Sequence, residues 1–175
     1  MLQITRRVDY ALIALTHLAV LRGERQSARE LAAAYRLSQP LMANVLKGLA
    51  RANFVRSIRG TKGGYELAEE PGAISVGQVV EALEGPLQLA ECVGQQPRDH
   101  MRCQLSRTCP VKRSVFKIHL EIRDVLYGYT VADLTRGAEL PGEGLPVARS
   151  GRHPALKAVT ADPDEACDLI SGRPS

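Results

Sequence analysis

Residues 27–68 read SARELAAAYRLSQPLMANVLKGLARANFVRSIRGTKGGYELA, and their capping and turn signals predict the fold class. Ser27-Ala28-Arg29-Glu30 is a capping box, in which the serine hydroxyl and the glutamate carboxylate each satisfy an N–H group at a helix start. Ser38 is expected to cap a second helix that runs to about Ala52, with Pro40 in its first turn. Its inward side chains are expected to be Leu41, Val45, Leu46 and Leu49. Two short helices joined by a tight turn predict a helix-turn-helix.

The segments around this pair complete a winged helix. Residues 53–58 and 65–68 are strand-like, and the glycine-rich basic turn 59–64 between them predicts a β-hairpin. Apolar residues at helical spacing predict a leading helix within 4–22 and a further helix over 76–83. The predicted fold class is mainly α with a small β-hairpin: a winged helix-turn-helix domain plus a long dimerisation helix.

Composition and charge narrow the functional class. The chain of 175 residues is 45% apolar and 24% charged, with two Phe, five Tyr and no Trp, which favours a core of aliphatic side chains between helices. No apolar run approaches the ~20 residues of a membrane span, so a cytoplasmic protein without membrane contact is expected. Residues 1–68 hold eleven basic and four acidic side chains, whereas the remainder holds twelve and fifteen. A basic first half suggests a module that binds a polyanion.

The second half contains a cysteine-bearing loop and a long helix. Pro110 is expected at the first helical position, and apolar residues then follow at alternating spacings of three and four, which is an a/d seam. A narrow seam either covers a core or pairs with its own copy, and the helix-turn-helix favours a homodimer that reads two half-sites. The predicted seam comprises Val111, Val115, Ile118, Ile122, Val125 and Tyr129.

Four segments are therefore expected. They are a winged helix-turn-helix DNA-binding domain at 1–83, a cysteine-bearing cluster loop at 84–109, a dimerisation helix with a final turn at 110–135, and a disordered tail at 136–175.

The helix beginning at Ser38 is expected to enter the major groove of double-stranded DNA, where its first turn meets base edges. Gln and Asn can bind adenine through two hydrogen bonds, and basic residues further along the helix and in the hairpin contact phosphate. The alternative is an ordinary polar surface and a hairpin that merely needs its glycines. The candidate DNA-binding residues are Ser38, Gln39, Asn44, Lys47, Arg51, Arg59, Gly60, Lys62 and Gly63.

Three cysteines lie close together, at Cys92, Cys103 and Cys109. A disulfide network is not expected in a cytoplasmic chain, and the absence of a C-x2-C pair argues against a compact zinc site. Three thiolates on a loop suit an iron–sulfur cluster, while three unliganded thiols are the alternative. Cys167 stands apart in the tail and is assigned no role.

The wing FVRSIRGTKGGYELA with the following SVGQVVEALEG, and the opening RRVDYALIALTHLA, resemble the IscR/NsrR/RirA-type (Rrf) family of bacterial winged-helix iron–sulfur transcription regulators. The likeness covers residues 1–134 and implies an iron–sulfur cluster, a DNA operator and a dimer. It also places Arg59 in a minor groove. The loop between the first two cysteines is longer here than in familiar members, but extra loop length costs only ~0.6 kcal/mol per doubling.

The same resemblance bears on the fourth ligand. In one branch a His follows the last cysteine, but Lys112 stands there in this chain. In another branch an acidic residue of the partner subunit's first helix closes the site, and Asp9 matches that position. His100 is the rival ligand, whereas His119 is expected too far along the long helix. A [4Fe-4S] cluster is favoured over a [2Fe-2S] cluster.

The leading hypothesis is a dimeric DNA-binding transcription regulator, a repressor, whose DNA binding responds to iron–sulfur status, nitric oxide or redox state. The sequence does not indicate whether the cluster-bound or the cluster-free form binds DNA. A thiol-redox or zinc-dependent winged-helix repressor is the first alternative, and a protein-interaction adaptor is another. An enzyme is not expected, because no phosphate loop, nucleophile elbow or metal-hydrolase motif is found.

Overall fold

The computed structural model describes residues 5–60, 63–90, 105, 108–136, 138 and 140. These residues fall into two compact units, one formed by those up to 85 and from 126 onward, the other by those from 86 to 125. The described part is mainly helical with a two-stranded antiparallel sheet, which confirms the predicted fold class. The elements are α1 (Arg6–Val20), α2 (Ala28–Ala34), α3 (Gln39–Arg51), β1 (Val55–Ile58), β2 (Gly64–Leu67), the 3-10 helix η1 (Pro71–Ala73), α4 (Val76–Glu84), α5 (Lys112–Gly128) and α6 (Val131–Thr135).

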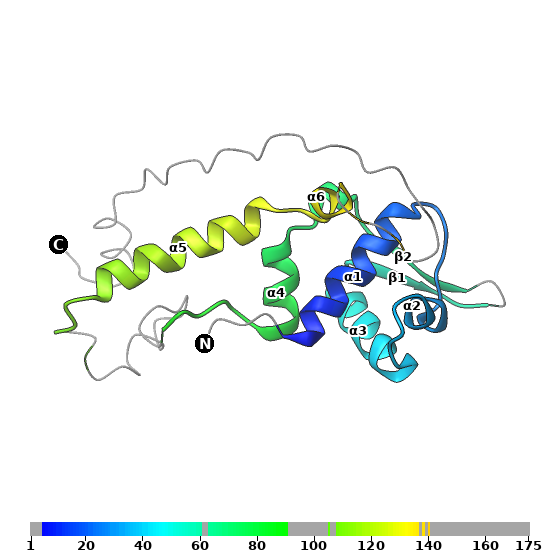
Figure 1. The fold of residues 1–175 in the computed structure, drawn as a ribbon, viewed down its shortest axis with the longest axis horizontal. Coiled ribbons are helices and arrows are strands. Elements are labelled where there is room, and N and C mark those ends of the chain that lie inside the picture. Colours follow the sequence, from blue (N-terminus) through cyan, green and yellow to red (C-terminus); the bar gives the residue numbers. More distant parts are fainter. Residues whose placement is uncertain are drawn as a thin grey trace. The chain divides into compact units, whose positions relative to one another are not determined.

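The core of the first unit is built around α1, which contacts α3, α4 and α6 (Figure 1). Its inward face repeats at helical spacing, and its buried apolar residues are Val8, Ala11, Ala14, Leu15 and Leu18. Apart from Met42 and Phe54, the core cluster consists of aliphatic side chains, as expected for a chain so poor in aromatic residues. The core is therefore a packed helix layer, and it fixes where α3 lies on the surface.

Capping interactions define where the short helices start. The expected capping box forms at Ser27, which accepts from the backbone N–H of Glu30 while the Glu30 carboxylate accepts from the backbone N–H of Ser27. Two further boxes form at Ser75 with Gln78 and at Thr130 with Asp133. These caps fix the first residues of α2, α4 and α6, which are too short to be stable alone.

Two details of the helices differ from the sequence-based expectation. Leu41 was expected to point inward, but its side chain is 37% exposed, and Met42 is fully buried in its place. The long helix begins at Lys112 rather than at Pro110, which lies in the preceding turn.

The segment after α5 returns to the first unit. Val131 of α6 is fully buried and belongs to the same core cluster as Val8 and Leu15. The backbone joins in as well, because the N–H of Val131 donates to the carbonyl of Ile74 at 2.9 Å. In the residues expected to form the tail, Leu140 is described and buried. In the described ranges, no helix has the length and apolar character needed to cross a bilayer.

Candidate nucleic-acid interface and cysteine site

The solvent-facing side of α3 carries the polar residues that the sequence singled out. The opposite side holds Met42, Val45, Leu46 and Leu49 in the core. The residues left exposed are Ser38, Gln39, Asn44, Lys47 and Arg51, together with Pro40 and Leu41. The Ser38 hydroxyl makes no capping hydrogen bond to the helix, so it remains available to another partner. The first turn of α3 therefore presents hydrogen-bonding groups, and its later turns present two cations.

The hairpin after α3 is in the register expected for a wing. Val55 pairs with Leu67 and Ile58 pairs with Gly64, so the tip lies at 59–63. Arg59 is exposed there. Gly60 has φ +123°, a conformation that favours glycine, and a Cβ on Gly63 would lie 2.8 Å from the Gly60 carbonyl oxygen. The two glycines are thus required by the turn itself. Lys62, the other predicted tip cation, lies outside the described residues.

The strands of the wing are braced by contacts that the sequence did not reveal. Tyr65 of β2 forms an isolated bridge with Gln26, with N···O distances of 2.8 and 3.0 Å. Glu66 accepts from Arg25 Nε and from Arg56 Nη2, each at 3.2 Å. These contacts connect both strands to the segment before α2, and so hold the wing against the helix-turn-helix.

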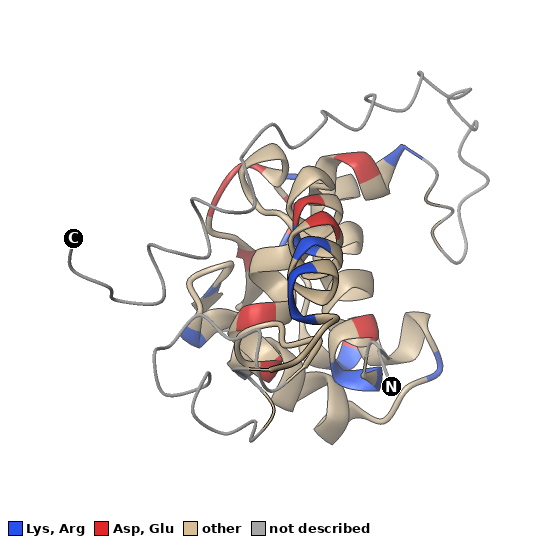
Figure 2. Ribbon diagram, turned by 90° about the vertical axis from the view of Figure 1, so that its left-hand side faces the viewer, with Lys and Arg blue, Asp and Glu red and all other residues tan. Residues whose placement is uncertain are grey.

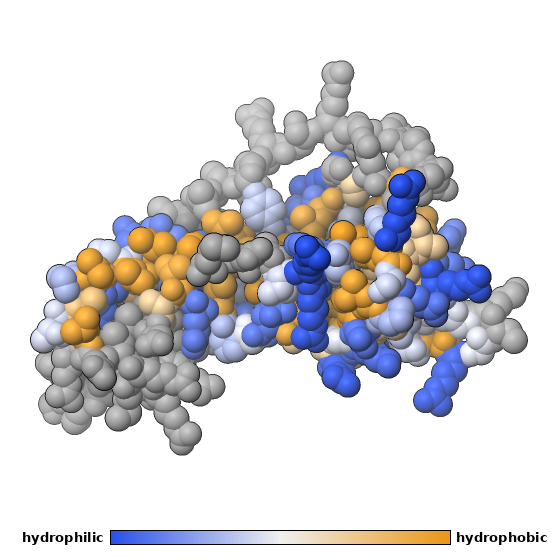
Figure 3. Space-filling view, turned by 60° about the horizontal axis from the view of Figure 1, so that its bottom comes forward, coloured by the Kyte–Doolittle hydropathy of each residue, from blue (hydrophilic) through white to orange (hydrophobic). Residues whose placement is uncertain are grey.

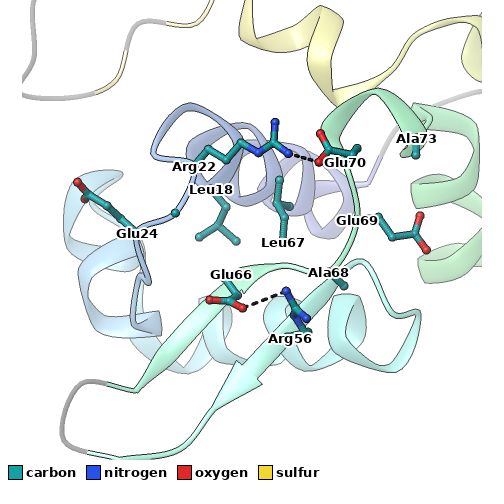
Figure 4. Close-up of a pocket in the computed structure, with 11 residues that line it drawn as sticks. Leu18, Arg22, Glu24, Arg56, Glu66, Leu67, Ala68, Glu69, Glu70 and Ala73 are labelled. Carbon is teal, nitrogen blue, oxygen red and sulfur yellow. Dashed lines mark hydrogen bonds and ion pairs between the residues drawn. The ribbon is translucent and has the colours of Figure 1, made fainter.

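An open cavity of about 630 Å³ lies behind the wing, between the end of α1, the hairpin and η1 (Figure 4). Four carboxylates line it, from Glu24, Glu66, Glu69 and Glu70, against the cations of Arg22 and Arg56. Arg22 forms an ion pair with Glu70. An excess of carboxylates repels phosphate, so this cavity does not suit nucleic acid, unlike the α3 face and Arg59 at the wing tip.

A buried polar pair positions the helix-turn-helix. His17 of α1 is buried, and its Nδ1 lies 3.0 Å from the hydroxyl of Tyr35, the residue that ends α2. The two rings meet edge to face, with centroids 5.6 Å apart. Burial lowers the pKa of His17 and raises the pKa of Tyr35. The neutral pair therefore connects α1 to the turn that leads into α3.

Only part of the predicted cysteine site falls within the described residues. Cys109 lies three residues before α5 and is half-buried. Cys92, Cys103 and the rival ligand His100 lie outside the described residues, as does Cys167. Among the described residues, no group of three or more His, Cys, Asp or Glu side chains is placed to hold a metal. The convergence of the three cysteines therefore stays a prediction.

Asp9 lies in the first turn of α1 and is exposed. Within the described ranges its carboxylate has no hydrogen bond or ion pair, although an acidic group at a helix N-terminus also interacts favourably with the helix dipole. His119 lies on α5 and is buried.

The start of α1 is fastened to the end of α4. The Thr5 hydroxyl accepts from the N–H of Val8 and donates to Glu84 Oε1 at 2.9 Å. Arg7 Nη1 donates to the carbonyl of Leu83, also at 2.9 Å. The cysteine-bearing segment begins just after Glu84. The end of α4, where this segment starts, is therefore hydrogen-bonded to the first turn of α1, which carries Asp9.

The long helix α5 presents apolar side chains to solvent. Val111, Ile118 and Val125 repeat every seven residues and are exposed, Ile118 by 47%. The other seam residues, Val115, Ile122 and Tyr129, are half-buried. Figure 3 shows apolar side chains gathered along this helix. Its first half carries the basic residues Lys112, Arg113 and Lys117, and its second half carries Glu121 and Asp124 together with Arg123. Figure 2 colours these basic residues blue and the acidic residues red.

Three comparisons place these features among known proteins. Residues 4–137 match the family model Rrf2, described as an iron-dependent transcriptional regulator. The HTH-type transcriptional regulator NsrR of Shouchella clausii is 33% identical over 134 residues, which are 76% of this chain and 88% of that protein. The solved structure of CymR, the global cysteine regulator of B. subtilis, is similar with a TM-score of 0.65 and 30% identity, over 79% of this chain and 100% of that one. The structure of T. potens IscR is similar with a TM-score of 0.60 and 31% identity, over 79% of this chain and 89% of that one.

Proposed function

Because the chain belongs to the Rrf2 family of transcriptional regulators, we propose that it is a homodimeric, sequence-specific DNA-binding protein whose DNA affinity responds to an iron–sulfur cluster. The observation that carries the DNA-binding part is the exposed face of α3, with hydrogen-bonding groups in its first turn and cations beyond it. In a winged helix this arrangement directs the first turn to base edges and the cations to phosphates.

Each DNA contact has a proposed role. Gln39 and Asn44 have the geometry to bind adenine bidentately, and the Ser38 hydroxyl can serve either as donor or as acceptor. Lys47 and Arg51 neutralise phosphates further along the groove. Arg59 at the wing tip reaches a minor groove, where negative potential is concentrated. Gly60, Gly63 and the neighbouring Lys62 complete the wing contact.

The homodimer is proposed to form through α5. Its exposed stripe of Val111, Ile118 and Val125 has the seven-residue repeat of a pairing seam. The net charges of the two halves favour an antiparallel partner, because the positive first half of one helix then faces the second half of the other, where Glu121 and Asp124 outnumber Arg123. Two α3 helices in one dimer would read two half-sites.

The residues proposed to hold the cluster are Cys92, Cys103 and Cys109, with Asp9 of the partner subunit as fourth ligand and His100 as its rival. The chemistry of this donor set fits, since thiolates are the ligands that hold iron–sulfur clusters and an exposed carboxylate has no competing partner within the described ranges. A bound cluster supplies a group that oxygen, nitric oxide or iron shortage can alter. We favour [4Fe-4S] over [2Fe-2S].

The hydrogen bonds at the start of α1 supply a physical connection between the two functions. Thr5 and Arg7 hold the end of α4, where the cysteine segment begins, and α1 packs against α3. A change in the cysteine segment can thereby reach α1 and, through its packing, α3; a regulatory coupling further requires that these helices take up two arrangements.

Anaerobic purification, with visible spectroscopy, iron and sulfide assays and duplex-DNA titration, tests the proposal. We expect iron and sulfide bound to the protein, and a DNA affinity that differs before and after cluster removal. Protein without iron, or with the same affinity in both forms, would refute the cluster-responsive part.

The similarity to CymR favours a second candidate, a regulator that senses thiols through the same three cysteines. This candidate predicts DNA affinity that changes with reversible cysteine oxidation in iron-free protein. If the protein is instead a zinc-dependent repressor, we expect the purified protein to contain stoichiometric zinc and no iron.

A further inference from the structure

Leu41 is the unexpected residue on the exposed face of α3. Of the large apolar side chains that the described residues expose, the others lie on α5 or just before it, and Leu41 is the one in the first unit. It belongs neither to the hydrophobic core nor to the partly buried side chains that pack against it. Folding of the single chain therefore covers this leucine only in part and leaves 37% of its surface facing solvent.

The place of Leu41 on the helix suggests a partner. It is the third residue of α3, in the first turn, and Asn44 lies one turn further along the same side. All its exposed neighbours on this face are polar or charged, except Pro40. In the proposed DNA complex, the first turn of α3 is the part that meets base edges in the major groove.

The major groove offers one apolar feature to such a side chain. Of the four bases, only thymine carries a methyl group on its major-groove edge, and apolar side chains contact it there. We propose that Leu41 is a specificity-determining residue that recognises the C5-methyl group of a thymine. This inference rests on the proposed function, since it requires α3 to enter the major groove.

The spacing along the helix places this thymine relative to the base that Asn44 contacts. Three helical residues advance by about 4.5 Å, which is close to the about 3.4 Å between successive bases on one strand. The thymine contacted by Leu41 and the adenine contacted by Asn44 are therefore expected close together within one half-site.

A test must isolate the methyl group from every other feature of the operator. The full-length protein, purified anaerobically, is first used to select its preferred duplex from a random-sequence library. Each thymine of that duplex is then replaced in turn by deoxyuridine, which lacks only the methyl group. Binding to each duplex is measured for the wild-type protein and for Leu41→Ala.

We expect the wild-type protein to lose about fourfold in affinity at one thymine per half-site, as for loss of one buried methyl contact. For the Leu41→Ala variant, replacing that same thymine by deoxyuridine should no longer reduce the affinity, while the effects at all other thymines stay unchanged. Lys47→Ala is the matched control, because it should weaken binding to every duplex, flatten the salt dependence and keep the uridine penalty. Thermal melting should show that Leu41→Ala is folded, with at most a modest loss of stability, since the side chain is partly covered but outside the core cluster.

The outcomes separate this inference from the proposed function. If salt-dependent binding to a selected duplex is found but no thymine is sensitive, or if the penalty persists in Leu41→Ala, the assignment of Leu41 is wrong while DNA binding stands. If no duplex is selected or bound, both are wrong, and Leu41 then belongs to a surface for another macromolecule.

Discussion

Gly77→Ala tests how the last turn of α5 is held against the DNA-binding unit. Gly77 lies in the first turn of α4 and faces the ring of Tyr127. A Cβ at position 77 would lie 2.6 Å from Tyr127 Cε2 and 2.9 Å from its Cγ, which is far inside van der Waals contact. The ring is not free to turn away, because the Tyr127 hydroxyl donates to Glu81 Oε2 at 2.7 Å.

The magnitude follows from two opposing effects. Forcing an extra methyl into a packed contact costs about 1–3 kcal/mol, whereas replacing glycine by alanine within a helix gains up to about 1 kcal/mol. The gain is smaller in a first turn, so we expect a net loss of about 1–2 kcal/mol in unfolding free energy. Gly128→Ala is the matched control, because no atom lies within 4 Å of its Cβ and the variant should be neutral or slightly stabilised.

The unfolding free energy of both variants is measured by urea titration. Circular dichroism is the probe, because the chain has no tryptophan for fluorescence. The protein concentration is held fixed, because the stability of a dimer depends on it. Tyr127→Ala should relieve the clash, so the double variant with Gly77→Ala should be less destabilised than the sum of the two single changes. Unchanged stability of Gly77→Ala, or additive effects in the double variant, would refute the proposed packing.

Four further predictions concern the surfaces and the buried histidine. Ile118→Asp should yield a folded monomer, because it places a charge in the pairing stripe, and a variant that still dimerises by light scattering contradicts the seam. Arg59→Ala should weaken operator binding by about 1–3 kcal/mol, and unchanged affinity would remove the wing tip from the interface. Cys109→Ala should abolish the visible chromophore of anaerobic protein while Cys167→Ala retains it; the reverse pattern would overturn the ligand set. Burial lowers the pKa of His17 in the folded state, so on acidification the unfolded state binds a proton at this position first. The unfolding free energy should therefore fall as the pH drops below about 6.5, and His17→Gln should lack this part of the pH dependence.

Local chemistry made much of the fold predictable. The capping box at Ser27 and the glycine-rich turn at 59–64 are short-range signals, and both elements lie where the sequence indicates. The direction of Leu41 was mispredicted because two adjacent apolar residues allow two helical phases. Met42 with Val45, Leu46 and Leu49 follows the spacing 3, 4, 7, and packing against α1 selects that phase.

Contacts between distant segments were not predictable in the same way. The His17–Tyr35 pair, the two arginines around Glu66 and the burial of Val131 all depend on tertiary placement. A lone histidine, a surface glutamate and a valine after a helix have many ordinary surroundings, so no local pattern distinguishes these roles. The cysteine site depends in the same way on tertiary placement. Of its three cysteines, Cys109 alone lies within the described residues.

The return of α6 to the core of the first unit has a consequence for the order of events on the ribosome. Val131 and the hydrogen bond from its N–H to Ile74 complete a core whose other members are synthesised much earlier. At about 5–20 residues per second, the interval between the end of α4 and the emergence of α6 is about 2–10 seconds. Every cysteine that we assign to the cluster is made within that interval. A nascent chain therefore acquires these three cysteines before the core of its first unit can close, and a chain cut short ahead of α6 leaves Ile74 and its neighbours uncovered.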